Sequence, residues 1–288
     1  MYTRELDEIE REWASEGLMT ARQLLPLMGP VSTWQNWKDE ERRTLTYLMT
    51  ATARASESAF LLCAYGQFWD AEVLTRSALE GTLKFCYLLQ SPATFPTRHQ
   101  EYAHDLFQIG RSKDHIKAAE VLASVPDPDA AEWLPIREML LSDEELADIR
   151  TRYDKTTRSR LEARWGFTGL IGELSRSGDS LFRGFGAAAH GYSIASHVAH
   201  VDYTGASIPM DRDMRSSERK ETIHLVHEGR LISDLLIYLL WRLTIGYRFV
   251  GADMEPLTGA WSTIQALSEK FKKAYGEWLD VEYSAKNI

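Results

Sequence analysis

Two long helical patterns separated by only two residues constrain the fold of this chain more than any other feature. Apolar residues recur at helical spacing from about Asp39 to Tyr65 and again from Phe68 to Leu89, with Gly66-Gln67 between them. A link this short leaves two helices antiparallel and side by side. The sequence therefore predicts a helical hairpin at the centre of the fold.

The rest of the chain is also helical in pattern. No convincing run of alternating β-branched residues bounded by hairpin turns occurs, so we predict an all-α fold, a multi-helix bundle with peripheral helices. We expect a loop containing Pro26, Gly29 and Pro30, and helix breaks at Gly205 and Pro209. Beyond the hairpin, helices are expected at about residues 5–16, 97–125, 129–141, 142–164, 168–175, 179–200, 213–249 and 256–278.

We expect these helices to form a single all-α domain over residues 1–288. Residues 1–38 would be an N-terminal helical extension, and residues 39–125 together with 165–288 the core bundle. Residues 126–164 are the least core-like segment, because charges of alternating sign dominate them. We interpret that segment as a charged helical insertion between two halves of one bundle.

Composition and charge limit the class of protein. A hydrophobic content of 44 % indicates a folded globule, and the apolar run 231–250 is interrupted by Asp234 and Arg242, which favours a buried core helix over a membrane span. A net charge of −9 disfavours RNA as a partner unless a local basic patch exists. The charged N-terminus resembles no signal peptide, and Cys63 and Cys86 fit buried thiols of a reducing compartment. We therefore expect a cytoplasmic protein.

Polar side chains gather on one side of the helix expected at 179–200. An imidazole with a pKa near 6.5 can act as a general acid or base, and a neighbouring hydroxyl can position a substrate. For any one histidine, including His190 nearby, a hydrogen bond within a helix interface is the simpler interpretation. No carboxylate lies on the same arc, so no self-contained Ser-His-Asp triad is predicted. At about 100° per residue, one arc holds Tyr192, Ser193, Ser196, His197 and His200.

A ladder of alternating charge on the second hairpin helix has two interpretations. Glu72, Arg76, Glu80 and Lys84 follow one another at intervals of four residues. They can form the solvent face, where each pair contributes about 0.2–0.5 kcal/mol. Alternatively Arg76 and Glu80 face inward, where the carboxylate would hold the guanidinium and the guanidinium could bind an anion.

Metal binding is a weaker alternative. Glu101 with His104 and Glu221 with His224 have the Glu-x-x-His spacing that places two ligands on one helical face, as in di-iron carboxylate bundles. Pairs of this kind also arise by chance in a chain this rich in glutamate. We predict no metal and no other cofactor.

Three short motifs carry a resemblance to a known family. They are a hairpin segment at 53–89, a tryptophan-led helix start at Trp165, and a Tyr-x3-Ser-x3-His helix that begins at Tyr192. Over roughly residues 50–205 the chain resembles a bacterial family of domains of unknown function, of the DUF5677 type, whose core is similar to HEPN helical domains. The resemblance implies an all-α bundle with a HEPN-like core.

The resemblance also implies where a site would lie. The positions that match the family pattern are Arg76, Glu80, Tyr192, Ser196 and His200. In such a bundle the helix that carries the arginine and the glutamate packs beside the helix that carries the serine and the histidine. This favours an inward orientation for Arg76 and Glu80.

Two functions follow as hypotheses. The favoured one is a non-enzymatic module that binds a small ligand or a protein partner through an Arg/Glu/Ser/His seam, with a homodimer compatible with such a bundle. The alternative is a metal-independent ribonuclease or toxin-like enzyme of a defence system, since HEPN-like ribonucleases use an Arg-x4–6-His motif that Arg183 and His190 match. There His200 or His190 would withdraw a proton, while Arg76 or Arg183 would stabilise charge on phosphate.

Overall fold

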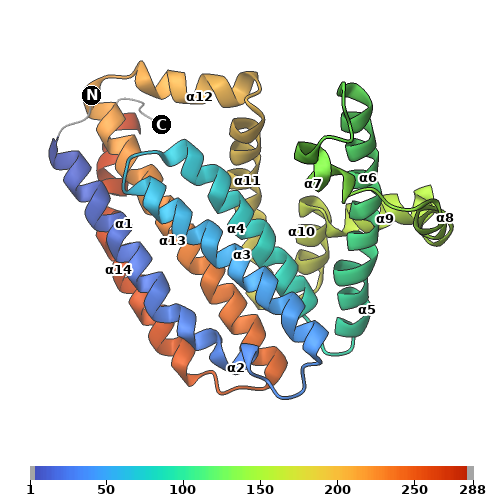
Figure 1. Cartoon of the computed structure of the whole chain (residues 1–288). Coiled ribbons are helices and arrows are strands. Elements are labelled where there is room, and N and C mark those ends of the chain that lie inside the picture. Colours follow the sequence, from blue (N-terminus) through green and yellow to red (C-terminus); the bar gives the residue numbers. More distant parts are fainter. Residues whose placement is uncertain (1–3, 284–288) are drawn as a thin grey trace. The chain divides into compact units, whose positions relative to one another are not determined.

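The computed structural model describes residues 4–283, and every regular element within them is a helix (Figure 1). The predicted all-α class is confirmed. The chain forms two compact units, residues 1–90 with 174–288 (unit 1) and residues 91–173 (unit 2). The segment expected as an insertion, 126–164, lies within unit 2, which extends beyond it on both sides.

Unit 1 contains the predicted hairpin and the long C-terminal helices. Its elements are α1 (Arg4–Leu24), the 3-10 helix η1 (Leu25–Met28), α2 (Gly29–Ser32), α3 (Asp39–Cys63), α4 (Phe68–Leu88), the 3-10 helix η4 (Ser180–Phe182), α11 (Phe185–His200), α12 (Tyr203–Asp213), α13 (Ser217–Val250) and α14 (Glu255–Tyr283).

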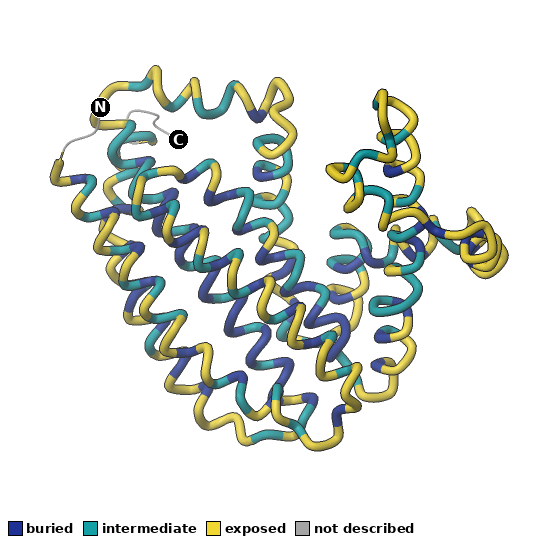
Figure 2. Tube along the Cα trace, in the orientation of Figure 1, coloured by how far each residue is buried: buried dark blue, intermediate teal, exposed yellow. Residues whose placement is uncertain are grey.

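The core of unit 1 lies between the hairpin and α13. Helices α3 and α4 pack against each other, α13 packs on α4, and α1 and α14 cover α13. Gly66 turns the chain between α3 and α4 with a φ of 67°, a conformation that glycine adopts without strain. Gly81 lets the two helices approach closely, because a Cβ there would lie 2.3 Å from Thr52 Oγ1. Figure 2 shows the buried residues concentrated along these helices.

The apolar run of the sequence forms the buried part of α13. Leu231, Leu235 and Leu243 are fully or almost fully buried there, as expected of a core helix. Among residues 4–283, no helix is both long enough and apolar enough to cross a membrane. Cys63 and Cys86 are free, buried thiols, as predicted.

Unit 2 is a smaller helical assembly. Glu101 is buried there, where its carboxylate accepts hydrogen bonds from Arg164 Nη1 at 2.5 Å and Trp165 Nε1 at 3.0 Å. The elements of unit 2 are α5 (Phe95–His99), a π-helical turn η2 (Gln100–Asp105), α6 (Leu106–Ser124), the 3-10 helix η3 (Ala131–Trp133), α7 (Leu134–Arg137), α8 (Asp143–Arg152), α9 (Lys155–Trp165) and α10 (Phe167–Arg176), which ends in unit 1.

The two breaks predicted at Gly205 and Pro209 are wrong, because α12 runs through both residues. Pro209 lies inside α12 and has no N–H to donate to the carbonyl of Gly205, so the helix forms without that internal hydrogen bond. Gly205 is required by packing rather than by a turn, since a Cβ there would lie 2.0 Å from His197 O. Asp202 supplies the missing start signal, as its side chain accepts a hydrogen bond from Gly205 N at 2.9 Å.

Other helix boundaries also differ from those predicted from the sequence. The expected loop around Pro26 is helical, as η1 and α2. The helix expected at 142–164 is two helices, because Asp154 caps the start of α9 by accepting from Thr157 N. The helix expected at 129–141 is regular only over η3 and α7, and the one expected at 179–200 is interrupted between η4 and α11.

Candidate functional site

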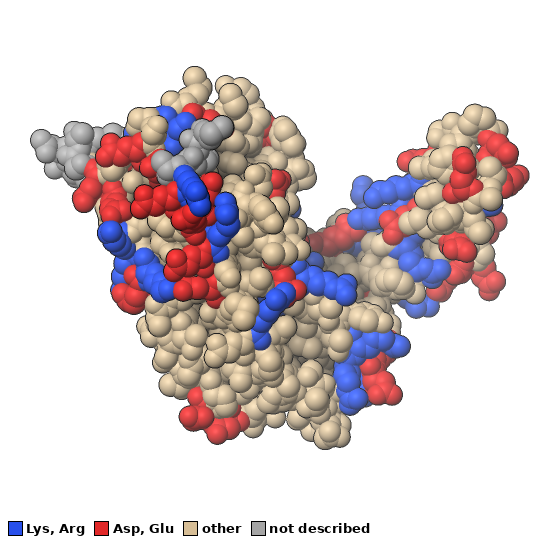
Figure 3. Space-filling view, turned by 60° about the vertical axis from the view of Figure 1, so that its left-hand side comes forward, with Lys and Arg blue, Asp and Glu red and all other residues tan. Residues whose placement is uncertain are grey.

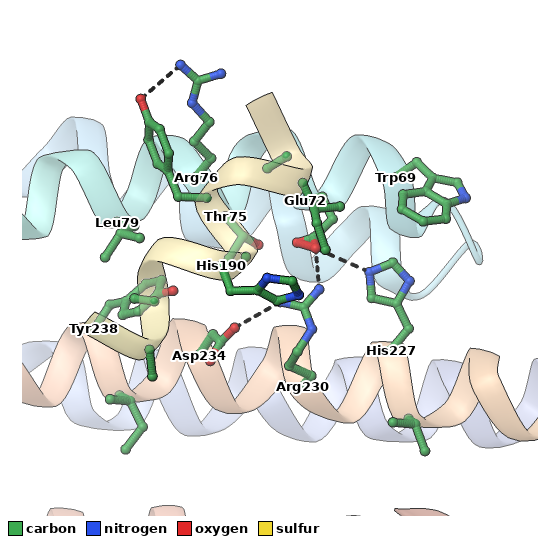
Figure 4. Close-up of a pocket in the computed structure, with 18 of the residues that line it drawn as sticks. Trp69, Glu72, Thr75, Arg76, Leu79, His190, His227, Arg230, Asp234 and Tyr238 are labelled. Carbon is green, nitrogen blue, oxygen red and sulfur yellow. Dashed lines mark hydrogen bonds and ion pairs between the residues drawn. The ribbon is translucent and has the colours of Figure 1, made fainter. Parts of the chain in front are cut away.

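A cavity of about 500 Å³ lies within unit 1, enclosed by four helices and the end of a fifth. Helices α4, α11 and α13 supply most of the wall, α12 adds Ile208 and Arg212, and α14 adds Trp278. Figure 4 shows how side chains from α4, α11 and α13 point into the space between these helices. The polar and aromatic lining residues are Trp69, Glu72, Thr75, Arg76, His190, Tyr192, Arg212, His227, Arg230, Asp234, Tyr238, Trp241 and Trp278.

A network of charges joins α4 to α13 along this wall (Figure 4). Glu72 is only 2 % exposed, and its carboxylate pairs with the guanidinium of Arg230. Arg230 Nη1 also donates to Asp234 Oδ2 at 3.1 Å. His227 Nε2 lies 3.6 Å from Glu72 Oε1. The interpretation of the ladder as a solvent face therefore does not hold for Glu72, which is interior.

His227 is held as a neutral imidazole in one tautomer. Arg212 Nη1 lies 2.6 Å from His227 Nδ1. Because a guanidinium only donates, Nδ1 accepts and the ring proton sits on Nε2, on the side of Glu72. Burial lowers the pKa of His227 to about 4, so the ring is uncharged at neutral pH.

The two acids of this network differ in their ionisation. Burial acts to raise the pKa of Glu72, but its contacts with His227 and Arg230 outweigh burial and hold the pKa below its usual value. Burial raises the pKa of Asp234 to about 6, against the opposing charge of Arg230. About a third of the Asp234 side chain is accessible, because it faces the cavity. Glu72 is thus a permanent anion, whereas Asp234 can exchange a proton near neutral pH.

A second polar group, at the α4–α11 contact, consists of Arg76, Glu80 and Tyr192. Arg76 Nη2 donates to the Tyr192 hydroxyl at 3.1 Å, and Arg76 Nε donates to Glu80 Oε1 at 3.3 Å. The tyrosine hydroxyl donates to the same carboxylate oxygen at 3.0 Å, and the guanidinium lies 4.6 Å from the centre of the ring. The structure therefore brings three of the residues singled out from the sequence into one half-buried triangle.

The remaining residues of the expected seam are placed apart from that triangle. Ser193 and His200 are exposed, and Ser196 is half-buried. Among the described residues, no hydrogen bond or ion pair joins any of these three to Arg76 or Glu80. His197 Nδ1 instead lies 2.6 Å from Asp202 Oδ2, at the turn into α12.

Of the two residues of the candidate ribonuclease motif, Arg183 and His190, only the histidine borders the cavity. His190 lines the cavity from α11, and in Figure 4 its side chain extends toward α13. Arg183 lies before the first turn of α11, is exposed and is absent from the cavity wall. Of the two histidines considered as a base, His190 borders the cavity and His200 does not.

Donors outnumber acceptors among the polar groups of the wall. Its three guanidiniums and three indole rings only donate, while its two carboxylates both contact Arg230. The Arg212 guanidinium lies 4.3 Å from the centre of the Trp69 ring, a cation–π contact. Within the described residues, three buried polar atoms of lining residues have no hydrogen-bond partner: Thr75 Oγ1, His227 Nε2 and Trp278 Nε1.

Sequence reasoning missed the α13 half of this site. The sequence analysis did not single out His227, and it treated Asp234 only as an interruption of the apolar run 231–250. A signal was present, since His227, Arg230 and Asp234 fall at spacings of three and four on one face of an otherwise apolar helix. Such polar residues on a buried face are unusual unless they meet a partner.

The pairs with metal-ligand spacing have other contacts. Glu101 binds Arg164 and Trp165, as described above. His224 Nδ1 lies 3.3 Å from Glu10 Oε1. Residues 4–283 contain no group of three or more His, Cys, Asp or Glu side chains arranged to hold a metal ion.

Comparison with known protein families identifies a family. A family model described as a family of unknown function, DUF5677, matches residues 43–217. This range includes α4, α11 and α12, and it ends where α13 begins. No curated protein and no solved structure matches the sequence.

Proposed function

The chain belongs to the DUF5677 family of unknown function, and we propose that it is a binding module that holds a small organic anion in the cavity of unit 1. The observation that carries the proposal is the wall itself, in which donor-only guanidiniums and indoles surround a space of about 500 Å³. Pockets of this size accommodate small molecules and combine apolar walls with a few placed polar groups.

The chemistry of the wall specifies the ligand class. Guanidiniums bind carboxylates and phosphates with charge-assisted hydrogen bonds, so an acidic group on the ligand has partners here. The apolar part of the wall, with Trp69, Tyr238 and Trp241, suits a flat hydrocarbon or aromatic part. We therefore expect the ligand to carry one acidic group on a planar apolar body.

A pair of probes tests the proposal. The carboxylate 2-naphthoate should quench the tryptophan fluorescence of the full chain, because three indoles border the cavity. Its Kd should be about tenfold lower than that of 2-naphthamide, which has the same shape without the charge, a difference of about 1.4 kcal/mol. Fluorescence titration at pH 7 measures both constants.

Two variants locate the binding. Arg212→Gln removes a cavity guanidinium, and we expect it to abolish most of the preference for the carboxylate. Arg248→Gln changes an exposed arginine of α13 and should leave that preference unchanged. Equal affinities for naphthoate and naphthamide, or a preference unaffected by Arg212→Gln, would contradict the proposal.

Ribonuclease activity is the second candidate, because Arg76 and His190 line the same cavity. A guanidinium and an imidazole could there stabilise a phosphate and withdraw a proton. Incubation of the full chain with RNA in the presence of EDTA tests it: cleavage should occur and should be lost in His190→Ala but not in His200→Ala. We favour the binding module, because on the face in Figure 3 acidic and basic side chains are intermixed and no continuous basic surface appears.

A further inference from the structure

A second, much smaller cavity in unit 1 borders a buried arginine. Arg242 lies in the C-terminal half of α13 and is only 2 % exposed. It lines a cavity of about 30 Å³ between α1, α3 and α13, whose other walls are mostly apolar. The side chains at its edge include Arg22 and Glu57, which pair with each other at 2.9 Å.

Protein groups accept few hydrogen bonds from this guanidinium. A guanidinium has five N–H donors. Among the described residues, the one hydrogen bond of the Arg242 side chain runs from Nε to Tyr238 O at 3.3 Å, and no carboxylate lies within ion-pair distance. Burial lowers its pKa only to about 10, so the group remains a cation at neutral pH. The Nη nitrogens of Arg242 are not among the fully buried side-chain atoms that lack a partner, so they border accessible space such as the small cavity.

We propose that the 30 Å³ cavity beside Arg242 is a binding site for a small monovalent anion of the size of chloride. The volume is on the order of one or two water molecules, which is enough for one small ion. An anion would neutralise the guanidinium and accept hydrogen bonds from it, whereas the one carboxylate of the wall, Glu57, is paired with Arg22. Buried polar groups that lack a protein partner commonly have an ordered water or ion. The site is separate from the larger cavity and does not depend on the proposed ligand there.

Thermal unfolding of the full chain tests the site with sodium chloride, sodium bromide and sodium gluconate at equal ionic strength. Gluconate is too large for the cavity, so we expect a Tm about 2–4 °C higher in chloride and bromide, as for a ligand that binds the folded state alone. Arg242→Met should remove this difference, whereas Arg248→Met, which replaces an exposed arginine of the same helix, should retain it.

A crystal grown in sodium bromide gives a readout that needs no variant. We expect an anomalous bromide peak in the cavity beside the Arg242 guanidinium. Equal Tm values in the three salts, or a cavity that holds only water in bromide, would overturn the proposal. If Arg242→Met does not fold, the salt series on the parent protein and the bromide crystal still decide between the two outcomes.

Discussion

Replacing Glu72 with glutamine is expected to lower the free energy of unfolding by about 3 kcal/mol, the lower end of the range for breaking a buried ion pair. The substitution keeps the shape of the side chain but removes the negative charge that pairs with Arg230 and lies 3.6 Å from His227. We expect the lower end because Arg230 keeps Asp234 as a partner and borders the cavity. Urea unfolding at pH 7, followed by tryptophan fluorescence, measures the loss.

The matched control is Glu8→Gln, which makes the same chemical change in an exposed Arg–Glu pair. Arg4 and Glu8 lie 3.0 Å apart on the surface of α1. Exposed pairs of this kind contribute about 0–1 kcal/mol, so the unfolding curve should move little. A Glu72→Gln protein as stable as the parent would show that Glu72 does not hold α4 to α13 through its charge.

Replacing Glu228 with methionine is expected to stabilise the protein at pH 7 by on the order of 3 kcal/mol. Glu228 is completely buried, and neither oxygen of its carboxyl group has a hydrogen-bond partner among the described residues. Burial, together with the charge of Glu10, raises the pKa of Glu228 to about 10. Methionine has a similar volume and no charge to desolvate, so it should fit the same space.

The sign of the effect follows from proton binding. The folded state keeps Glu228 protonated up to about pH 10, whereas the unfolded chain loses that proton near pH 4.5. Stability is therefore complete below the unfolded pKa and falls as pH rises toward the folded pKa, by about 1.4 kcal/mol per pH unit. Between pH 4.5 and pH 7, a span of 2.5 pH units, the loss in free energy of unfolding amounts to about 3 kcal/mol. This is the stabilisation expected when methionine replaces Glu228.

A pH series between 7 and 8.5 isolates Glu228. In that window His227 and Asp234 do not make the stability depend on pH, because their shifted pKa values affect it only below about pH 6.5. The parent should lose stability across the window, and Glu228→Met should lose much less. Glu277→Met, an exposed glutamate of α14, should follow the parent. Parallel pH profiles for the parent and Glu228→Met would show that Glu228 is ionised in the folded protein.

Local signals allowed the helices to be predicted closely. The hairpin helices end within two residues of their expected limits, because Gly66 supplies a positive φ and apolar residues recur at helical spacing on both sides. Helix α12 was missed because Gly205 and Pro209 usually break helices. Its formation depends on Gly205 packing against the backbone of α11, a contact between separate helices that residue-by-residue reasoning cannot anticipate.

The candidate site was predicted only in part, for a related reason. Arg76 and Tyr192 meet as the family resemblance suggested, and the hydrogen bond between them spans 116 positions. The same helical arc also holds Ser193 and His200, which are exposed. A shared arc shows which residues lie on one side of a helix, but not how far along that helix its neighbour extends. The α4–α11 contact includes Tyr192, while His200 is the last residue of α11.

The sequence alone therefore determined the class of fold, the hairpin and the helical nature of nearly every segment, because these depend on interactions between residues close in the chain. Only the tertiary structure decided that Glu72 is interior, that it meets His227 and Arg230 from α13, and that Arg242 is buried without a carboxylate partner among the described residues. Whether a charged side chain is exposed to solvent or buried between helices depends on which helix covers it, and that is set by the packing of segments distant in the sequence.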